Sequence, residues 1–209
     1  MSFVRHLLRT TDLDGARAFY LAVLGFTPEV VPLPAQALAR GARPHWLGHL
    51  GVEDVEDATR RFVELGATKL GSPPGTCILR DPGGAIVAFE PRRAPETRVL
   101  ANVNNSGALL ESMEAYRSLF GWTFGEPVEL GAHLVIHPFA HGAFVDVKGR
   151  PGVHTHWLFQ FPVSDLDRAM DEVRARGGLL TPVLTLPSGE RVVACDDPQG
   201  AAFAMRSAR

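Results

Sequence analysis

His45, His49 and Glu90 are the residues whose types and spacing could hold a metal ion. The two histidines lie four residues apart in one apolar run, and Glu90 ends another such run. Because alternate side chains of a strand share a face, His45 and His49 are expected to point the same way. Imidazole and carboxylate groups bind divalent transition metals. These three residues are therefore a candidate metal site.

Two arginines favour a different chemistry in the same part of the sequence. Arg5 and Arg9 lie in the first apolar run, and a guanidinium group pairs with a carboxylate or phenolate but repels a metal cation. Arg5 could therefore bind an anionic ligand group, with His49 as a hydrogen-bond partner or base. Alternatively, these side chains and Glu90 form an ion-paired strand end with a structural role. The sequence leaves both interpretations open.

Composition and the absence of known motifs exclude several classes of protein. The chain has 209 residues and a net charge of -2, which gives no electrostatic reason to bind nucleic acid or an anionic membrane. No apolar run approaches the roughly 18 residues of a membrane span, and no signal-peptide pattern is present. Cys77 and Cys195 have apolar neighbours and indicate reduced core thiols in a cytoplasmic protein. Nucleophile-elbow, phosphate-loop and dinucleotide motifs are absent, although acid–base catalysis needs none of them.

The chain is a tandem duplication. Four segments recur in the same order at offsets of 96, 111, 111 and 116 residues: 19–27 with 115–123, 45–47 with 156–158, 52–58 with 163–169, and 81–85 with 197–201. Collinear matches of this kind are the signature of an internal repeat. The proline-containing segment 91–96 is a natural linker, so we predict a first domain at 1–92 and a second at 97–209.

Each copy is predicted to contain two helices and several short strands. Apolar periodicity indicates a helix at 13–24 with Asp12 as N-cap and with Ala16, Phe19, Tyr20 and Val23 on one face, and a helix at 55–65 with Asp54 as N-cap. In the second copy it indicates helices from 109 to a stop at Gly121 and from 166 to a stop at Gly177. Strands are predicted at 4–9, 46–52, 100–105 and 157–163, and hairpins at 77–80 with 85–89 and at 192–195 with 202–205. Their turns are expected to contain Gly84 and Gly200. The second copy has room for further strands at 122–130, 133–139 and 143–148. The first copy has only 27–32 there, followed by a loop or short helix, so its sheet is expected to be truncated.

The order of these motifs resembles the vicinal-oxygen-chelate superfamily of glyoxalases, bleomycin-resistance proteins and extradiol dioxygenases. The resemblance is carried by Asp12-Leu13, Ala16, Phe19-Tyr20, Leu24-Gly25-Phe26, Trp46-Leu47, Val52, Asp54 and residues 81–85. The second copy resembles the two-domain bacterial branch through Tyr116, Phe120-Gly121-Trp122 and Trp157-Leu158. The resemblance implies an α+β fold in which tandem βαβββ modules form two cupped mixed sheets with helices outside. It specifies no activity, since this scaffold hosts lyases, dioxygenases, epimerases and non-catalytic drug-binding proteins.

The resemblance also implies a divalent metal in each cup, with ligands from the first strand, the strand before the second helix and the last strand. These positions fall on Arg5, Leu47 and Ala88 in the first copy, and on Ala101, Leu158 and Ala204 in the second. Alkyl and guanidinium groups donate no lone pair to a metal. We therefore expect no metal cofactor and a metal-independent small-molecule-binding protein, monomeric or homodimeric. The alternative is a lyase or dioxygenase with displaced ligands His45, His49 and Glu90.

The second copy has neutral or cationic residues at the matching polar positions. Asn105, Gln160 and Arg206 correspond to Arg9, His49 and Glu90, and with Arg5 these residues form the predicted ligand-binding set. A group of histidines at 133, 137, 141, 154 and 156 has no cysteine or acidic partner at zinc spacing, so surface or strand-edge positions are predicted for it. A third hypothesis is a structural or partner-binding duplicate without a ligand.

Overall fold

The computed structural model describes residues 2–130 and 134–207. In the first copy the elements are β1 (Phe3–Thr10), α1 (Leu13–Leu24), β2 (Glu29–Pro32), α2 (Ala35–Ala39), β3 (His45–Val52), α3 (Val55–Glu64), β4 (Thr68–Gly71), β5 (Cys77–Arg80) and β6 (Ile86–Pro91). In the second copy they are β7 (Ala101–Ser106), α4 (Leu109–Phe120), β8 (Val128–Leu130), β9 (Leu134–Phe139), β10 (Gly142–Asp146), β11 (His156–Val163), α5 (Leu166–Ala175), β12 (Leu179–Leu180), β13 (Leu184–Thr185), β14 (Arg191–Asp196) and β15 (Ala202–Ser207).

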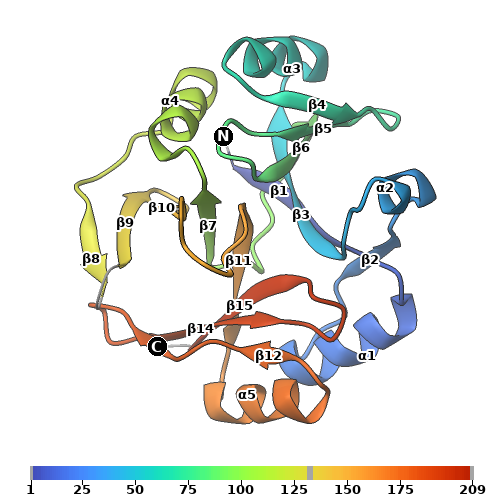
Figure 1. The fold of residues 1–209 in the computed structure, drawn as a ribbon, viewed down its shortest axis with the longest axis vertical. Helices are drawn as coiled ribbons and strands as arrows, with labels where there is room; N and C mark the ends of the chain where they lie inside the picture. The colour runs from blue at the N-terminus through green and yellow to red at the C-terminus, as the bar shows by residue number, and fades with distance from the viewer. Residues whose placement is uncertain (1, 131–133, 208–209) are drawn as a thin grey trace. The chain divides into compact units, whose positions relative to one another are not determined.

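The described strands form two mixed sheets, which confirms the predicted α+β class (Figure 1). The first copy supplies a sheet of order β2-β1-β3-β6-β5-β4. The second copy supplies the order β12-β14-β15-β11-β7-β10-β9-β8, with β13 paired to β14. The smaller sheet of the first copy confirms the predicted truncation.

Contacts between Cα atoms group the chain into two compact units that draw on both copies. Unit 1 contains Met1–His6, Leu47–Thr97 and Ala101–Leu158, and unit 2 contains Leu7–Trp46, Arg98–Leu100 and Phe159–Arg209. The units are described separately below. The domain boundary between residues 92 and 97 remains a prediction.

Unit 1 has an aromatic core in which helices α3 and α4 pack together. Tyr116 of α4 stacks on Trp122 with ring centroids 4.9 Å apart, and it meets Phe144 of β10 edge-on at 5.4 Å. Phe62 of α3 contacts Phe89 of β6 at 5.2 Å. Aromatic pairs at these separations add stability beyond their buried area. The side of the strands that faces α3 and α4 therefore forms the interior of unit 1.

Unit 2 is organised by α1 and α5, which pack against each other, with α5 beside β12 (Figure 1). Tyr20 of α1 contacts Trp46 and Phe203 edge-on, each at 5.2 Å. Trp46 lies 4.9 Å from Phe161 of β11. The helix face predicted from Ala16, Phe19, Tyr20 and Val23 is buried.

Local signals in the sequence set the ends of the elements. Asp12 and Asp54 cap their helices through side-chain hydrogen bonds from backbone N–H groups, as predicted. In the Asp-Pro-x-Gly segments, the N–H of Gly84 donates to the carbonyl of Asp81 at 3.0 Å, and Gly200 donates to Asp197 at 2.9 Å. Both glycines have positive φ, 99° and 86°, a conformation that glycine adopts without a Cβ clash.

Some predicted elements differ from the structure. A strand at 122–130 is wrong, because only Val128–Leu130 is a strand and Phe124 makes an isolated bridge to Phe139. Gly125 and Pro127 interrupt the aromatic run there and disfavour a continuous strand. Part of the predicted strand 133–139, namely His133, lies outside the described residues. None of the helices in the described part of the chain is long and apolar enough to cross a bilayer.

Candidate functional site

Glu90 of β6 is the centre of a charged cluster in unit 1. Its carboxylate Oε2 lies 2.7 Å from Nδ1 of His49 on β3 and 3.7 Å from a guanidinium nitrogen of Arg5 on β1, and its Oε1 lies 2.7 Å from Arg93. The side chains of His49 and Glu90 are 3% and 9% exposed, whereas that of Arg5 is 30% exposed. Three of the predicted ligand-binding residues are therefore brought together, and two of them, Arg5 and His49, contact the carboxylate of the third, Glu90.

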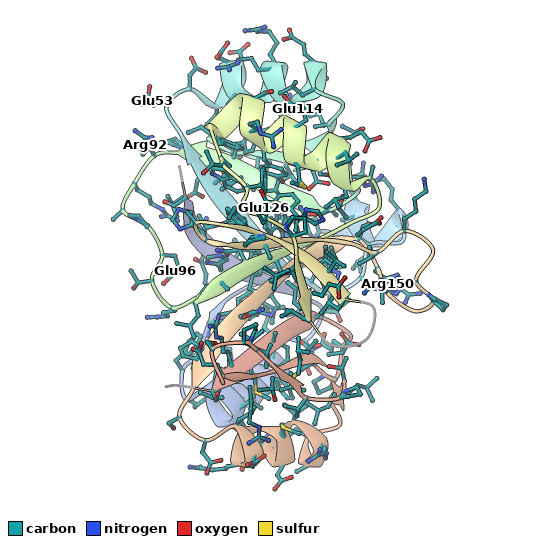
Figure 2. The ribbon with its side chains drawn as sticks, turned by 90° about the vertical axis from the view of Figure 1, so that its left-hand side faces the viewer. Glu53, Arg92, Glu96, Glu114, Glu126 and Arg150 are labelled. Carbon is teal, nitrogen blue, oxygen red and sulfur yellow. The ribbon has the colours of Figure 1, made fainter. Side chains whose placement is uncertain are left out.

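The cluster sits beside a more exposed ion pair at the ends of the same strands. Arg92 Nη1 lies 3.1 Å from Glu53 Oε1, and the two side chains are next to each other in Figure 2. The arginines and glutamates of this region thus pair locally. Pairs of this exposed kind add little stability, about 0–1 kcal/mol, so the buried contacts of Glu90 matter more for the site.

The metal-ligand positions implied by the resemblance do not fit a metal in unit 1. Leu47 and Ala88 are completely buried and have only alkyl groups to offer, and Arg5 at the remaining position is a fixed cation. In the second copy Ala101 and Ala204 are buried alkyl side chains. Among the described residues, no group of three or more His, Cys, Asp or Glu side chains is arranged to hold a metal ion.

The displaced ligand set is divided between the units. His49 and Glu90 belong to unit 1, whereas His45 belongs to unit 2 with Arg9. His45 Nδ1 lies 2.7 Å from the carbonyl oxygen of Arg43. Burial lowers the pKa of His45, and the charge of Arg9 lowers it further. The Nδ1 of His45 is thus engaged by a backbone carbonyl and a cation lies near its ring, so the structure does not favour the metal-dependent alternative.

Asn105 of β7 lies against a histidine from β11 in unit 1. Its Nδ2 is 3.3 Å from Nε2 of His156, whose Nδ1 is 2.8 Å from the carbonyl oxygen of His154. A carbonyl oxygen accepts hydrogen bonds only, so His156 carries its proton on Nδ1 and Nε2 accepts from Asn105. The same arrangement of Nδ1 with a carbonyl two residues earlier occurs at His45, the matching residue of the first copy.

An apolar sheet face adjoins Asn105. Strand pairing places Asn105 opposite Val145, Val145 opposite Ile136, and Ile136 opposite Val128. This face is the one away from α4, because the alternate residue Phe144 packs on Tyr116. Partly exposed members of the apolar face are Val103, Val128, Leu134, Ile136 and Pro138. We refer to these five residues with Asn105 as the β7–β9 face.

The remaining predicted residues lie in unit 2. Gln160 of β11 pairs with Ala204 of β15 in the strand register, and its buried Oε1 has no hydrogen-bond partner among the described residues. Arg206 pairs with Glu190 at 2.5 Å. These two residues stand on the adjacent strands β11 and β15. Their ligand-binding role remains a prediction.

Two buried networks repeat the same chemistry in the two units. In unit 1 Trp157 Nε1 donates to the Tyr116 hydroxyl at 3.2 Å, and this hydroxyl donates to Asp81 at 3.1 Å. In unit 2 Trp46 donates to Tyr20 at 2.9 Å, and Tyr20 donates to Asp197 at 3.1 Å. Both tryptophans are buried.

These networks hold buried carboxyl groups with perturbed titration. Burial raises the pKa of Asp81 to about 6, against the opposing effect of hydrogen bonds from Asn104, Ala85, Tyr116 and Gly83. Burial also raises the pKa of Asp197. Each carboxyl comes from one copy and its tyrosine from the other, so the networks join the copies within each unit.

Sequence reasoning missed Arg93 and His156. Arg93 was placed in the linker, although its spacing of three residues from Glu90 could have suggested an ion pair. His156 was expected on the surface or at a strand edge, and it is partly buried against Asn105. Equivalence of His45 and His156 in the repeat was the available signal for a shared role.

The chain is similar over nearly its whole length to proteins of known sequence and structure. No family model matches it. It is 25% identical over 242 aligned positions to "Putative glyoxylase CFP32" of Mycobacterium bovis, covering 95% of this chain and 91% of that protein, and the protein of the same name from Mycobacterium tuberculosis gives the same values.

Solved structures share the fold at low sequence identity. The 2,3-dioxygenase LapB from Pseudomonas sp. KL28 superposes with a TM-score of 0.63 at 11% identity, covering 99% of this chain and 92% of that one. 4-Hydroxymandelate synthase from Streptomyces coelicolor gives 0.63 at 17% identity, covering 100% and 93%. The 2,2',3-trihydroxybiphenyl 1,2-dioxygenase from Sphingomonas wittichii gives 0.64 at 12% identity, covering 99% and 90%. At these identities the likeness concerns the fold.

Proposed function

We propose that this chain, which has the vicinal-oxygen-chelate fold, binds a small molecule without a divalent metal. The ligand class is a compound with an aromatic or other apolar body and a polar group. The similar proteins are named "Putative glyoxylase CFP32", 2,3-dioxygenase LapB and 2,2',3-trihydroxybiphenyl 1,2-dioxygenase, and these names agree with a small-molecule ligand.

The observation that carries the proposal is the β7–β9 face of unit 1. Small-molecule sites are mostly apolar walls with a few polar groups that fix orientation. Val103, Leu134 and Ile136 supply partly exposed apolar surface, and Asn105 with His156 supplies hydrogen-bonding groups next to it. Asn105 is only 9% exposed. A ligand would therefore contact mainly the apolar side chains and would meet Asn105 and His156 at the edge of the β7–β9 face.

Metal independence is supported by the donor chemistry of unit 1. Leu47 and Ala88 cannot coordinate, and Glu90 is already held by Arg5, Arg93 and His49. A carboxylate in contact with two guanidinium groups would have to give up these partners to bind a metal. Binding by apolar contact and hydrogen bonds needs no such rearrangement.

A thermal-shift screen tests the proposal. The full chain is heated with small phenols, aromatic acids and thioesters, in buffer containing EDTA. A compound that binds the folded state at 100 times its Kd should stabilise it by about 2.7 kcal/mol. A metal-independent ligand is expected to raise the melting temperature equally with and without EDTA.

Two charge-introducing variants locate the binding surface. Ile136→Asp places a charge on the β7–β9 face and is expected to abolish the shift, whereas Leu110→Asp places one on α4, where Leu110 is 73% exposed, and is expected to preserve it. Ile136→Ala, which keeps the face apolar, serves where Ile136→Asp does not fold, and it should weaken binding. Stabilisation that disappears in EDTA, or that survives Ile136→Asp unchanged, would contradict the proposal.

A further inference from the structure

The charged cluster of unit 1 is arranged as a cation site would be, with Glu90 and His49 in the place of the ligands and Arg5 in the place of the cation. Glu90 offers a carboxylate oxygen and His49 an imidazole 2.7 Å away, from neighbouring parallel strands β6 and β3. A guanidinium nitrogen of Arg5 from β1 lies 3.7 Å from the same carboxylate oxygen. The carboxylate of Glu90 thus contacts an imidazole from the neighbouring strand β3 and a guanidinium group from β1.

We propose that the Arg5 guanidinium is a built-in replacement for a divalent cation in unit 1. This inference rests on the proposed metal independence and gives its physical cause. Arg5 supplies the positive charge that a buried carboxylate requires, since an uncompensated buried charge is costly. It also repels any second cation that approaches Glu90 and His49, so the two remaining donors do not act as metal ligands while Arg5 is present.

Arg93 offers a comparison within the same cluster. It contacts the other carboxylate oxygen of Glu90 at 2.7 Å but is half-exposed and lies beyond the end of β6. Arg5 instead lies inside β1, with a side chain that is 30% exposed. If a cation position exists between Glu90 and His49, a change at Arg5 should open it and a change at Arg93 should not.

The test is Co²⁺ binding to the full chain, followed by visible absorption and by melting temperature. Imidazole and carboxylate groups are suitable ligands for Co²⁺. Arg5→His removes the guanidinium and adds a third donor, and it is expected to change the protein from no detectable binding to one bound Co²⁺ per chain. The matched control Arg93→His is expected to bind none, and His49→Ala combined with Arg5→His should abolish the gained binding.

The variant Arg5→Ala tests the inference without an introduced histidine, so its result does not depend on how such a histidine would be oriented. Arg5→Ala removes the cation and is expected to lower the melting temperature, and Co²⁺ should restore part of the loss while leaving wild type and Arg93→Ala unchanged. Folded Arg5→His and Arg5→Ala that both ignore Co²⁺ would overturn the inference and leave the proposed function intact. Stoichiometric Co²⁺ on the wild-type chain at His49 would overturn both.

Discussion

Removing the hydroxyl of Tyr116 tests the buried network of unit 1. Tyr116→Phe keeps the ring that stacks on Trp122 but deletes the oxygen that accepts from Trp157 and donates to Asp81. The indole N–H of Trp157 is then a buried hydrogen-bond donor that has lost this acceptor, and the loss costs about 1–3 kcal/mol. Asp81 keeps its bond from Asn104 at 2.8 Å and its backbone donors, so its own loss is smaller, about 1 kcal/mol.

The expected total is a loss of about 2–4 kcal/mol in the free energy of unfolding, a large share of the 5–15 kcal/mol of a typical domain. Urea unfolding followed by fluorescence and circular dichroism measures it. Tyr20→Phe removes the equivalent hydroxyl of unit 2, between Trp46 and Asp197, and is expected to cost a similar amount. A loss below about 0.5 kcal/mol for Tyr116→Phe would refute the claim that the hydroxyl satisfies both neighbours.

Three further predictions concern titration, a helix cap and a helix end. The pKa of Asp81 is raised from 3.8 to about 6 by burial, so Asp81 contributes stability below pH 3.8 that is lost as the pH rises through 6. The pKa of His6 is lowered from 6.5 to about 4 by burial, so His6 contributes stability above pH 6.5 that is lost as the pH falls through 4. When the pH is lowered from 6.5 to 4, the free energy of unfolding measured in urea should therefore fall more steeply in Asp81→Asn than in wild type, and it should rise in His6→Gln. Profiles of both variants that run parallel to wild type would contradict this. Asp54→Ala removes the cap of α3 and should cost about 1 kcal/mol in the same assay, and an unchanged midpoint would count against the cap. Gly121→Ala, at φ 67°, should cost about 1 kcal/mol, whereas a gain in stability would show that this backbone conformation is not required.

The sequence was most informative where the physical signal is local. The caps Asp12 and Asp54 and the turns at Gly84 and Gly200 depend on residues within four positions of one another, and all are confirmed. The duplication also predicted a smaller first sheet. The strand predicted at 122–130 is wrong over most of its length, because Gly125 and Pro127 disfavour the interior of a strand.

Contacts between distant residues could not be predicted in the same way. His6 Nε2 lies 3.2 Å from Asn102 Oδ1, and these two residues are equivalent in the two copies, 96 positions apart. Tyr20 reaches Asp197 across 177 positions. Periodicity indicates that such residues are buried, but only the packing of one copy against the other selects the partner. The Glu90 cluster was partly predictable, since strand alternation predicts that His49 and Glu90 face the same side of the sheet. Arg93 follows the end of β6, where alternation no longer fixes the direction of a side chain.

Elemental analysis of the purified full chain tests the central claim most directly. The protein is prepared without chelator, incubated with an excess of Fe²⁺, Mn²⁺, Co²⁺ or Zn²⁺, passed through a desalting column and assayed for bound metal. The account predicts no stoichiometric metal, because Arg5, Leu47 and Ala88 supply no ligand atoms and Glu90 is paired. A stoichiometric ion that is retained by the wild-type chain and lost in His49→Ala would contradict it.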